Sequence, residues 1–267
     1  YVTVSGLRRD LEICRKEFSS VGNIGHFALG ADDHSGEFTL SQKIYGRDLE
    51  IASMLGLYDK VVNGKKALLT VAGVSGIGKT SLIREIQKPV VSRQGYYTEG
   101  KFDQFERSTP YTAILQSLTS LVRQILSESP IQIDLWKERF LKALEGNGQL
   151  ILDVIPELQH IIGEQEGLPN IQGTELENRF HRTFQRFVRA VCQTERPLVI
   201  FLDDMQWCDL ATLKLVTTLL QDSHISNLYL ILAYRDNEVS DTHPFAQTLS
   251  DIKQLKIIHN GLKLNSL

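Results

Sequence analysis

The sequence predicts an α/β fold in which helices wrap a parallel β-sheet. Two observations carry this prediction. Apolar runs at residues 67–72, 197–202 and 228–234 are continuous rather than alternating, which is typical of strands buried on both faces of a parallel sheet. Segments with helical spacing of apolar residues separate these runs, as this class of fold requires. With 267 residues, 42% of them hydrophobic, the chain can bury one large core with an appended subdomain.

The N-terminal stretch, residues 1–42, mixes a charged amphipathic segment at 7–18 with scattered glycines. We interpret it as a linker or N-terminal extension that holds one helix. A second helix is predicted from about residue 51 to Asn63, where Asn-Gly ends it. Gly46 and Arg47 lie just before the N-terminus of that helix. They would either contact the adenine edge of a nucleotide or simply start the helix.

A phosphate-binding loop is predicted between the first strand and the next helix. Residues 73–80 have the sequence G-V-S-G-I-G-K-T, which matches G-x-x-x-x-G-K-T in its required strand-loop-helix context. Glycines let successive N–H groups curl around a phosphate chain, and a helix N-terminus favours the anion. Lys79 would reach the β- and γ-phosphates, and the Thr80 hydroxyl would bind Mg²⁺. The expected nucleotide-binding residues are Gly73, Val74, Ser75, Gly76, Ile77, Gly78, Lys79, Thr80 and Ser81.

The region between this loop and the next apolar strand is predicted to be largely helical. A strand at 95–103 ends in polar residues, and ligands of parallel sheets sit at such ends. Helices then follow from residue 110, at 135–144 and at 150–162, the last with Pro156 as a possible break. Together with the helix described next, they form a helical insertion at about 112–193 before the strand at 197–204.

A further helix begins at residue 174, where Thr174 and Glu177 have the spacing of a capping box. Its predicted buried face carries Leu176, Phe180, Phe184, Phe187, Val188 and Val191. Its opposite face carries Arg179, Arg182, Arg186 and Arg189, which we interpret as a solvated face in preference to a surface for a partner or a phosphate.

The strand at 197–204 ends in two carboxylates, Asp203 and Asp204. Beside a phosphate loop, Asp203 would hold the Mg²⁺ shell, and Asp204 would orient or deprotonate the attacking water. Because many ATPases of this kind place the longer Glu there, we expect slow turnover. The alternative is a cluster that caps the helix at 210–221, for which Asp209 is better placed.

The strand at 228–234 is followed by Arg235. Its guanidinium would either sense the γ-phosphate or pair with Asp236 or Glu238, and the spacing leaves both open. A short helix at 245–252 and a last strand at 255–259 complete the alternation.

Composition narrows the function classes. A net charge of -3 gives no electrostatic argument for nucleic acid. The three cysteines lack metal-binding spacing and suit a reducing cytoplasm. No apolar run is long enough for a bilayer, and we expect neither a signal peptide nor a membrane segment. Because Tyr1 stands where Met would open a chain, we expect a piece of a longer polypeptide.

Residues 43–264 resemble the P-loop ATPase domain of the STAND class of AAA+ proteins. More narrowly, they are similar to the AAA-type module between an N-terminal Ser/Thr kinase domain and C-terminal GAF and histidine-kinase domains in large bacterial, notably cyanobacterial, multi-sensor signalling proteins. The motifs that carry this resemblance are Tyr45 to Glu50, Gly73 to Thr80, Gly100 to Gln104, Gly148-Gln149 with Asp153 to Glu157, Phe201 to Trp207, and Ala233 to Val239.

The resemblance implies an adenine-side role for Gly46 and Arg47, Mg-ATP bound at Lys79, Thr80 and Asp203, and a sensor role for Arg235. It also implies a regulatory module that binds ATP or ADP and switches neighbouring kinase and sensor domains, with possible homo-oligomers. The chain ends at Leu267, before the helical lid and winged-helix region of many STAND proteins, so lid contacts to the nucleotide are expected to be missing.

Other functions stay open at this stage. The module would hydrolyse ATP slowly, or it would be a nucleotide-bound interaction scaffold without turnover, or the ATPase of a STAND-type transcription regulator. A small-molecule kinase or a GTPase is disfavoured because no Asn-Lys-x-Asp signature is present. A DNA-loading ATPase is disfavoured by the charge.

Overall fold

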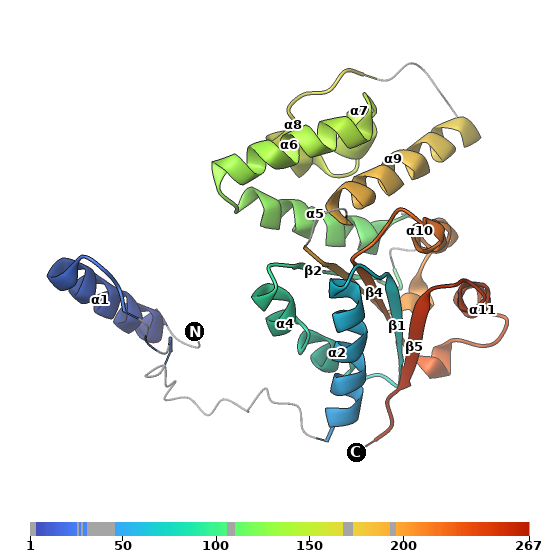
Figure 1. Ribbon diagram of the computed structural model, residues 1–267. Coiled ribbons are helices and arrows are strands. Elements are labelled where there is room, and N and C mark those ends of the chain that lie inside the picture. The colour runs from blue at the N-terminus through green and yellow to red at the C-terminus, as the bar shows by residue number, and fades with distance from the viewer. Residues whose placement is uncertain are drawn as a thin grey trace. The chain divides into compact units, whose positions relative to one another are not determined.

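The structure, a computed structural model, describes residues 4–25, 27, 29–30, 46–105, 110–167, 173–192 and 196–266. It divides into two units, Tyr1–Ile44 and Tyr45–Leu267. In the first unit, the predicted helix at 7–18 is confirmed as part of α1 (Val4–Val21). The segment after α1 turns back along it (Figure 1), and the backbone N–H groups of residues 25 and 30 donate to the carboxylates of Glu17 and Asp10.

The second unit is built on a five-stranded parallel sheet in the order β2-β3-β4-β1-β5 (Figure 1). This confirms the predicted α/β class. The register pairs Ala72 with Tyr234 and Lys101 with Asp203, so the carboxyl ends of the central strands meet at one edge. The strands are β1 (Ala67–Ala72), β2 (Tyr96–Lys101), β3 (Leu198–Asp203), β4 (Leu228–Tyr234) and β5 (Ile258–Lys263).

The last strand lies later than the predicted 255–259. The apolar residues Leu255 and Ile257 pack against the core from the turn that follows the preceding helix. Hydrogen bonding to β1 starts only at Ile258, which pairs with Ala67, and continues to Lys263. The apolar character of Leu255 and Ile257 therefore reflects packing against the core and not pairing with a neighbouring strand.

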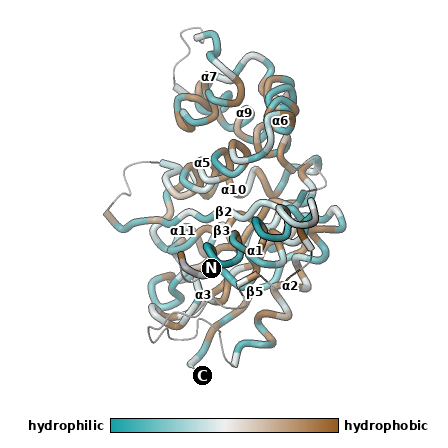
Figure 2. Tube along the Cα trace, turned by 90° about the vertical axis from the view of Figure 1, so that its left-hand side faces the viewer, coloured by the Kyte–Doolittle hydropathy of each residue, from teal (hydrophilic) through white to brown (hydrophobic). Residues whose placement is uncertain are grey.

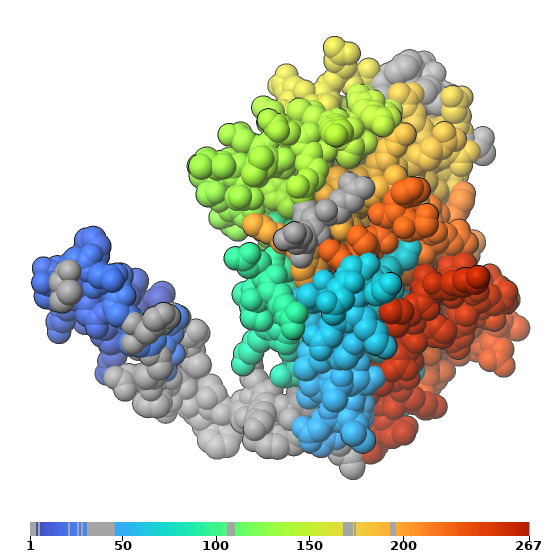
Figure 3. All heavy atoms as spheres, viewed as in Figure 1, coloured from blue at the N-terminus to red at the C-terminus, as the bar shows by residue number. Residues whose placement is uncertain are grey.

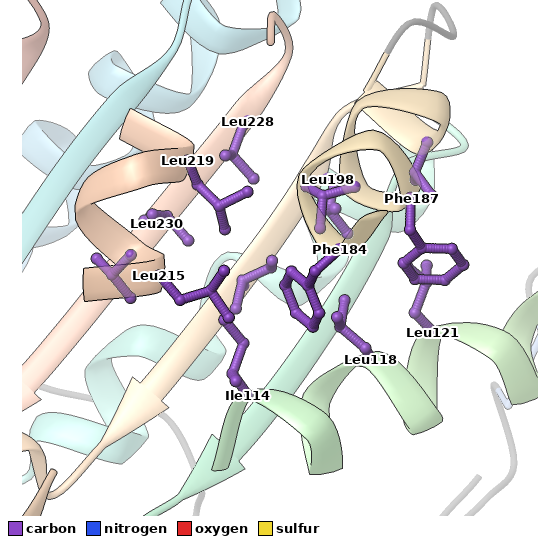
Figure 4. Packing of buried hydrophobic residues seen from close by; sticks show 14 of the residues in the cluster. Ile114, Leu118, Leu121, Phe184, Phe187, Leu198, Leu215, Leu219, Leu228 and Leu230 are labelled. Carbon is purple, nitrogen blue, oxygen red and sulfur yellow. The ribbon is translucent and has the colours of Figure 1, made fainter. Parts of the chain in front are cut away.

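One face of the sheet packs against α5 (Thr112–Leu126), α9 (Thr174–Cys192), α10 (Leu210–Gln221) and α11 (Pro244–Lys253). Figure 4 shows leucines of β3 and β4 directed at Ile114 and Leu118 of α5, Phe184 of α9 and Leu215 of α10. All of these side chains are fully buried. Each buried side chain of this size stabilises the fold by about 1.5–3 kcal/mol.

The opposite face carries the alternate residues of the same strands, as the two-residue period of a strand requires. Tyr229 of β4 stacks on Tyr58 of α2 (Asp48–Val62), and its hydroxyl donates to the carbonyl of Met54. This face is also covered by α3 (Lys79–Arg84) and α4 (Gln87–Ser92), and Leu82, Ile83 and Val90 of these helices are buried together with Ile86 between them. Pro89 falls in the first turn of α4, where its missing N–H costs nothing.

Helices α6 (Pro130–Leu144), α7 (Gly148–Leu152), η1 (Pro156–Leu158) and α8 (Gln159–Ile162) follow α5. With α9 they form a helical layer that lies directly against the rest of the unit in Figure 3. In Figure 2, α6 and α9 alternate between apolar and polar segments, as amphipathic helices do. None of the helices in the described ranges has the length and apolarity to cross a bilayer.

The outcome of three predictions for this layer is as follows, and two of them need correction. The helical stretch at 150–162 is interrupted at the predicted break, because Pro156 forces Ile155 out of the helical region (φ -133°, ψ 76°) and separates α7 from η1 and α8. Leu176, predicted to be buried, is 38% exposed. The arginine face of α9 is not simply solvated, because three of the four arginines bind neighbours within the unit. These pairs are Arg179 with Asn147, Arg186 with Glu145, and Arg189 with Asp222. The side chain of Thr174, and with it the capping box, lies outside the described residues.

Candidate functional site

The predicted phosphate loop connects β1 to α3 at the carboxyl edge of the sheet. Gly76 and Gly78 have φ angles of +77° and +96°, a region that residues with a Cβ rarely adopt. A Cβ on Gly73 would lie 3.0 Å from the Ile77 side chain and 3.1 Å from the Leu264 carbonyl oxygen. The glycines are therefore required by the path of this loop and by its close approach to the chain after β5.

Lys79 lies folded across the loop. Its Nζ donates to the carbonyl oxygens of Gly73 (2.8 Å) and Val74 (3.1 Å), and the residue is 7% exposed. Burial lowers the pKa of the Lys79 amine, and the carboxylates of Asp203 and Asp204 act against this shift. An ammonium whose hydrogen bonds go to neutral carbonyls is well suited to exchange them for a phosphate oxygen, because a charged acceptor forms the stronger bond.

Thr80 and Asp203 come together across 123 residues of sequence, with the Thr80 hydroxyl donating to Asp203 Oδ2 at 2.8 Å. Two ligands at adjacent corners of a Mg²⁺ octahedron are about 2.9 Å apart, given metal–oxygen distances of about 2.0–2.1 Å. Hard oxygen donors at this spacing fit Mg²⁺, which usually takes one or two protein carboxylates and completes its shell with phosphates and water. Among the described residues, no group of three or more His, Cys, Asp or Glu side chains could hold a metal unaided.

Asp204 follows the strand with a φ of +56° and is 5% exposed. Its carboxylate accepts a hydrogen bond from Gln206 Nε2 (2.8 Å) and lies 3.3 Å from Lys101 Nζ and 3.4 Å from Arg235 Nε. The left-handed backbone carries an energetic cost of about 1–3 kcal/mol and is frequent at functional sites. The alternative that Asp203 and Asp204 cap the helix at 210–221 is excluded. Asp209 caps that helix, α10 (Leu210–Gln221), by accepting a hydrogen bond from Thr212 N.

Of the two predicted alternatives for Arg235, the pairing with Glu238 is observed, and the γ-phosphate sensor role stays a prediction. Arg235 pairs with Glu238 (2.7 Å), which raises its pKa, and it also faces Asp204. The guanidinium lies 4.8 Å from the ring centre of Trp207 in η2 (Met205–Trp207). Asp236, in η3 (Asp236–Glu238), pairs with Lys263 instead. The ring and the carboxylates fix the direction of the cation at the edge of the cleft.

These side chains line one cleft of about 290 Å³. The cleft is lined by Ser75, Gly76, Gly78, Lys79, Thr80, Ser81, Lys101, Asp203, Asp204 and Arg235. A second hollow of about 510 Å³ shares the wall of Lys101, Asp204 and Arg235 and extends past Trp207 toward Gln116 of α5. Of the predicted binding residues, Gly73, Val74 and Ile77 belong to the same loop without lining the cleft.

Gly46 and Arg47 are not among the lining residues. Arg47 is 7% exposed, and it donates to the carbonyl oxygen of Asn265 (2.6 Å) and pairs with Glu50. Asn265 follows Leu264, whose carbonyl oxygen approaches Gly73. Arg47 is thus tied to the chain that borders the start of the phosphate loop.

Lys101 and Gln206 were missed by the sequence interpretation. Gln206 links the site internally, because its Oε1 accepts from Arg235 N and its Nε2 donates to Asp204. Lys101 did carry a signal, since it is the last residue of β2 and the carboxyl ends of parallel strands share one edge. Gln206 belongs to the motif Phe201 to Trp207 that carries the family resemblance, but its place in the site depends on the turn after β3.

The chain is similar in sequence to segments of larger proteins. The chain is 34% identical over 84% of its length to hybrid signal transduction histidine kinase G of Dictyostelium discoideum, and 25% identical over 68% of its length to histidine protein kinase 1 of Candida albicans. It spans only 7% and 8% of these two proteins. Among solved structures, the Cdc6p structure from Pyrobaculum aerophilum aligns with 84% of this chain and 47% of its own, at 12% identity and a TM-score of 0.46.

A family model described as the AAA ATPase domain matches residues 43–232. This range includes the phosphate loop, the carboxylates that end β3 and the whole helical layer between β2 and β3. Because the match covers more than half of the sequence, the chain belongs to the AAA ATPase domain family.

Proposed function

We propose that this domain binds Mg-ATP in the cleft at the carboxyl edge of the sheet, hydrolyses it slowly, and acts as a regulatory switch within a larger signalling kinase. The observation that carries the proposal is the hydrogen bond between Thr80 and Asp203. This contact supports the proposal, because it brings together the hydroxyl and the carboxylate that would bind Mg²⁺ in a site of this kind.

Nucleotide binding would use groups that are already directed at the cleft. The loop supplies backbone N–H groups, and Lys79 supplies a cation whose present acceptors are carbonyl oxygens of the same loop. Thr80 and Asp203 would hold the metal, which would neutralise charge on the β- and γ-phosphates. Lys101 and Arg235, which also line the cleft, would contact the terminal phosphate. Arg47, through Asn265, would contribute on the adenine side.

Hydrolysis would depend on Asp204. A carboxylate that orients water must have an oxygen free to accept a hydrogen bond. In the structure the Asp204 carboxylate is engaged by Gln206, Lys101 and Arg235 together. Movement of the two cations toward the nucleotide would leave Asp204 more basic and better able to accept a hydrogen bond from water, and we take their present position to favour slow hydrolysis.

A regulatory role is supported by the relatives. The two histidine kinases are much longer than the matched segment, so the domain would work beside other domains on one polypeptide. Nucleotide-dependent movement of Arg235 would alter its contact with Trp207, and η2, which carries Trp207, is followed directly by α10. The cleft would thus be coupled, through η2, to α10, which packs on one face of the sheet.

The binding proposal is tested by thermal unfolding of the wild type, Lys79→Ala and Lys88→Ala, each with and without Mg-ATP. Lys88 is an exposed lysine of α4 outside the cleft and serves as the matched control. ATP at a hundred times its Kd stabilises a single-site protein by about 2.7 kcal/mol, which corresponds to about 5–10 °C for a domain of this size. We expect this shift in the wild type and in Lys88→Ala only. An equal shift in Lys79→Ala would place the nucleotide elsewhere.

The alternative is a scaffold that binds nucleotide without turnover. Phosphate release by the wild type, lost in Asp204→Asn while the ATP-dependent thermal shift remains, would separate the switch from the scaffold. A thermal shift without any phosphate release in the wild type would favour the scaffold. GTP in place of ATP in the same assay tests the nucleotide preference.

A further inference from the structure

Gln206 lies in η2, the turn that follows β3, and its side chain joins the ends of β3 and β4. The residue is 4% exposed. Its Nε2 donates to Asp204 Oδ1 at 2.8 Å, and its Oε1 accepts from Arg235 N at 3.1 Å. A backbone N–H can only donate and an ionised carboxylate can only accept, so both bonds form in only one orientation of the amide. The two neighbours therefore fix the direction of the Gln206 side chain.

The backbone of Gln206 is held as well. Nδ1 of His243 accepts from Phe245 N at 3.1 Å, so the proton of the neutral ring lies on Nε2, which donates to the carbonyl oxygen of Gln206 at 3.2 Å. Trp207 N donates to the carbonyl oxygen of Asp204 at 3.0 Å and closes the turn. Because its side chain and its backbone are both fixed, Gln206 is preorganised to hold Asp204 in one direction.

The two carboxylate oxygens of Asp204 are held to different degrees. Oδ1 accepts from Gln206 Nε2 and lies 3.4 Å from Arg235 Nε, whereas Oδ2 lies 3.3 Å from Lys101 Nζ. The Lys101 side chain is 65% exposed, and a solvated ion pair of this kind is weak. The buried bond from Gln206 costs more to break, because its loss leaves polar groups unpaired. Oδ2 is therefore the oxygen that is more readily released to water, while Oδ1 sets the direction of the carboxylate.

We propose that Gln206 is a positioning residue for ATP hydrolysis, which holds Oδ1 of Asp204 so that Oδ2 is directed at the attacking water. The inference rests on the proposed function, because it assigns Gln206 a part in that reaction. Gln206 is not among the residues that line the cleft, so it acts through Asp204 and not on the nucleotide. Its loss should therefore lower kcat and leave the KM for Mg-ATP nearly unchanged.

Steady-state phosphate release at varied Mg-ATP concentrations tests this role in Gln206→Leu, which keeps a side chain of similar size without the amide. We expect kcat to fall at least about tenfold and KM to change less than about threefold. Asp209→Ala is the matched control, because it removes the cap of α10 and lowers stability outside the cleft. Its kcat should stay within about twofold of the wild-type value, which separates lost positioning from lost stability.

Gln206→Glu gives an independent readout, and it decides the question if Gln206→Leu does not fold. The new carboxyl group keeps an acceptor for Arg235 N, and while protonated it can still donate to Asp204 Oδ1. Two carboxylates at this distance resist ionising together, so this shared proton is lost only as the pH rises. We expect the kcat of Gln206→Glu, divided by the wild-type kcat at the same pH, to fall with rising pH. Titration of His243 and of other groups common to both proteins cancels in this ratio, and a ratio independent of pH overturns the proposal.

The outcomes separate this role from the proposed function. A wild type that hydrolyses ATP, together with a Gln206→Leu variant that keeps its kcat, overturns the positioning role and leaves the proposed function intact. An equal loss of kcat in Asp209→Ala also overturns it, because stability alone would then set the rate. A wild type that releases no phosphate removes the hydrolytic function, and the role of Gln206 with it.

Discussion

Gly100 lies where β2 and α5 approach most closely, so its replacement by alanine probes the part of the fold that positions Lys101. A Cβ on Gly100 would lie 1.8 Å from the carbonyl oxygen of Ala113 and 2.6 Å from its carbonyl carbon. Non-bonded carbon contacts are about 3.5 Å or longer, so α5 would have to move by about 1.5 Å or more. Because α5 is anchored by Ile114 and Leu118, both fully buried, this movement disturbs the core.

The expected cost of Gly100→Ala is about 3 kcal/mol in the free energy of unfolding, the upper end of the range for overpacking, because the obstacle is helix backbone and not a flexible side chain. Urea unfolding followed by circular dichroism measures it. Gly56→Ala is the matched control, since Gly56 lies inside α2 with nothing within 4 Å of an added Cβ. There we expect a gain of about 0.5–1 kcal/mol, because alanine favours the helix.

If Gly100→Ala lowers the free energy of unfolding and Gly56→Ala raises it, the contacts around each glycine, and not the residue type, set the effect of the substitution. An unfolding free energy for Gly100→Ala within about 0.5 kcal/mol of the wild type would refute the close packing of β2 on α5. If the variant folds, its thermal shift with Mg-ATP should also fall, because Lys101 follows Gly100 directly in the cleft wall.

Three further predictions address the cap, the buried ion pair and the cleft. Asp209→Ala removes the carboxylate that caps α10, and urea titration should show a loss of about 1–2 kcal/mol. Burial raises the pKa of Asp222, but hydrogen bonds led by those from Arg189 outweigh it and hold the net pKa below the ordinary 3.8. The stabilisation by ionised Asp222 is therefore present above pH 3.8 and is lost as the pH falls through the depressed folded pKa. The difference in urea midpoint between the wild type and Asp222→Asn should be constant near neutral pH and shrink in strong acid; a constant difference throughout would contradict this assignment. Lys101→Ala should change the unfolding free energy by less than about 1 kcal/mol, because the Lys101 side chain is 65% exposed in its pair with Asp204. Its thermal shift with Mg-ATP should nonetheless decrease, and an unchanged shift would remove Lys101 from the site.

Most of the fold could be predicted because its signals are local or periodic. The bounds of β1, β4 and α10 match their apolar patterns, since strands buried on both faces leave little ambiguity. The errors fell where an apolar residue packs without belonging to a regular element or lies on a helix without being buried. Leu255 was assigned to a strand although it packs from a turn, and Leu176 was assigned to the buried face of α9 although it is 38% exposed.

The sequence by itself determined the chemistry of the candidate site. The phosphate loop is a contiguous motif, and parallel strands place Asp203 and Arg235 at the same edge as the loop whatever the details of packing. The tertiary structure alone decided which groups face one another. The contact of Lys101 with Asp204 and that of Arg47 with Asn265 join residues far apart in the chain. Such contacts depend on strand register and on the path of turns, which no local pattern encodes.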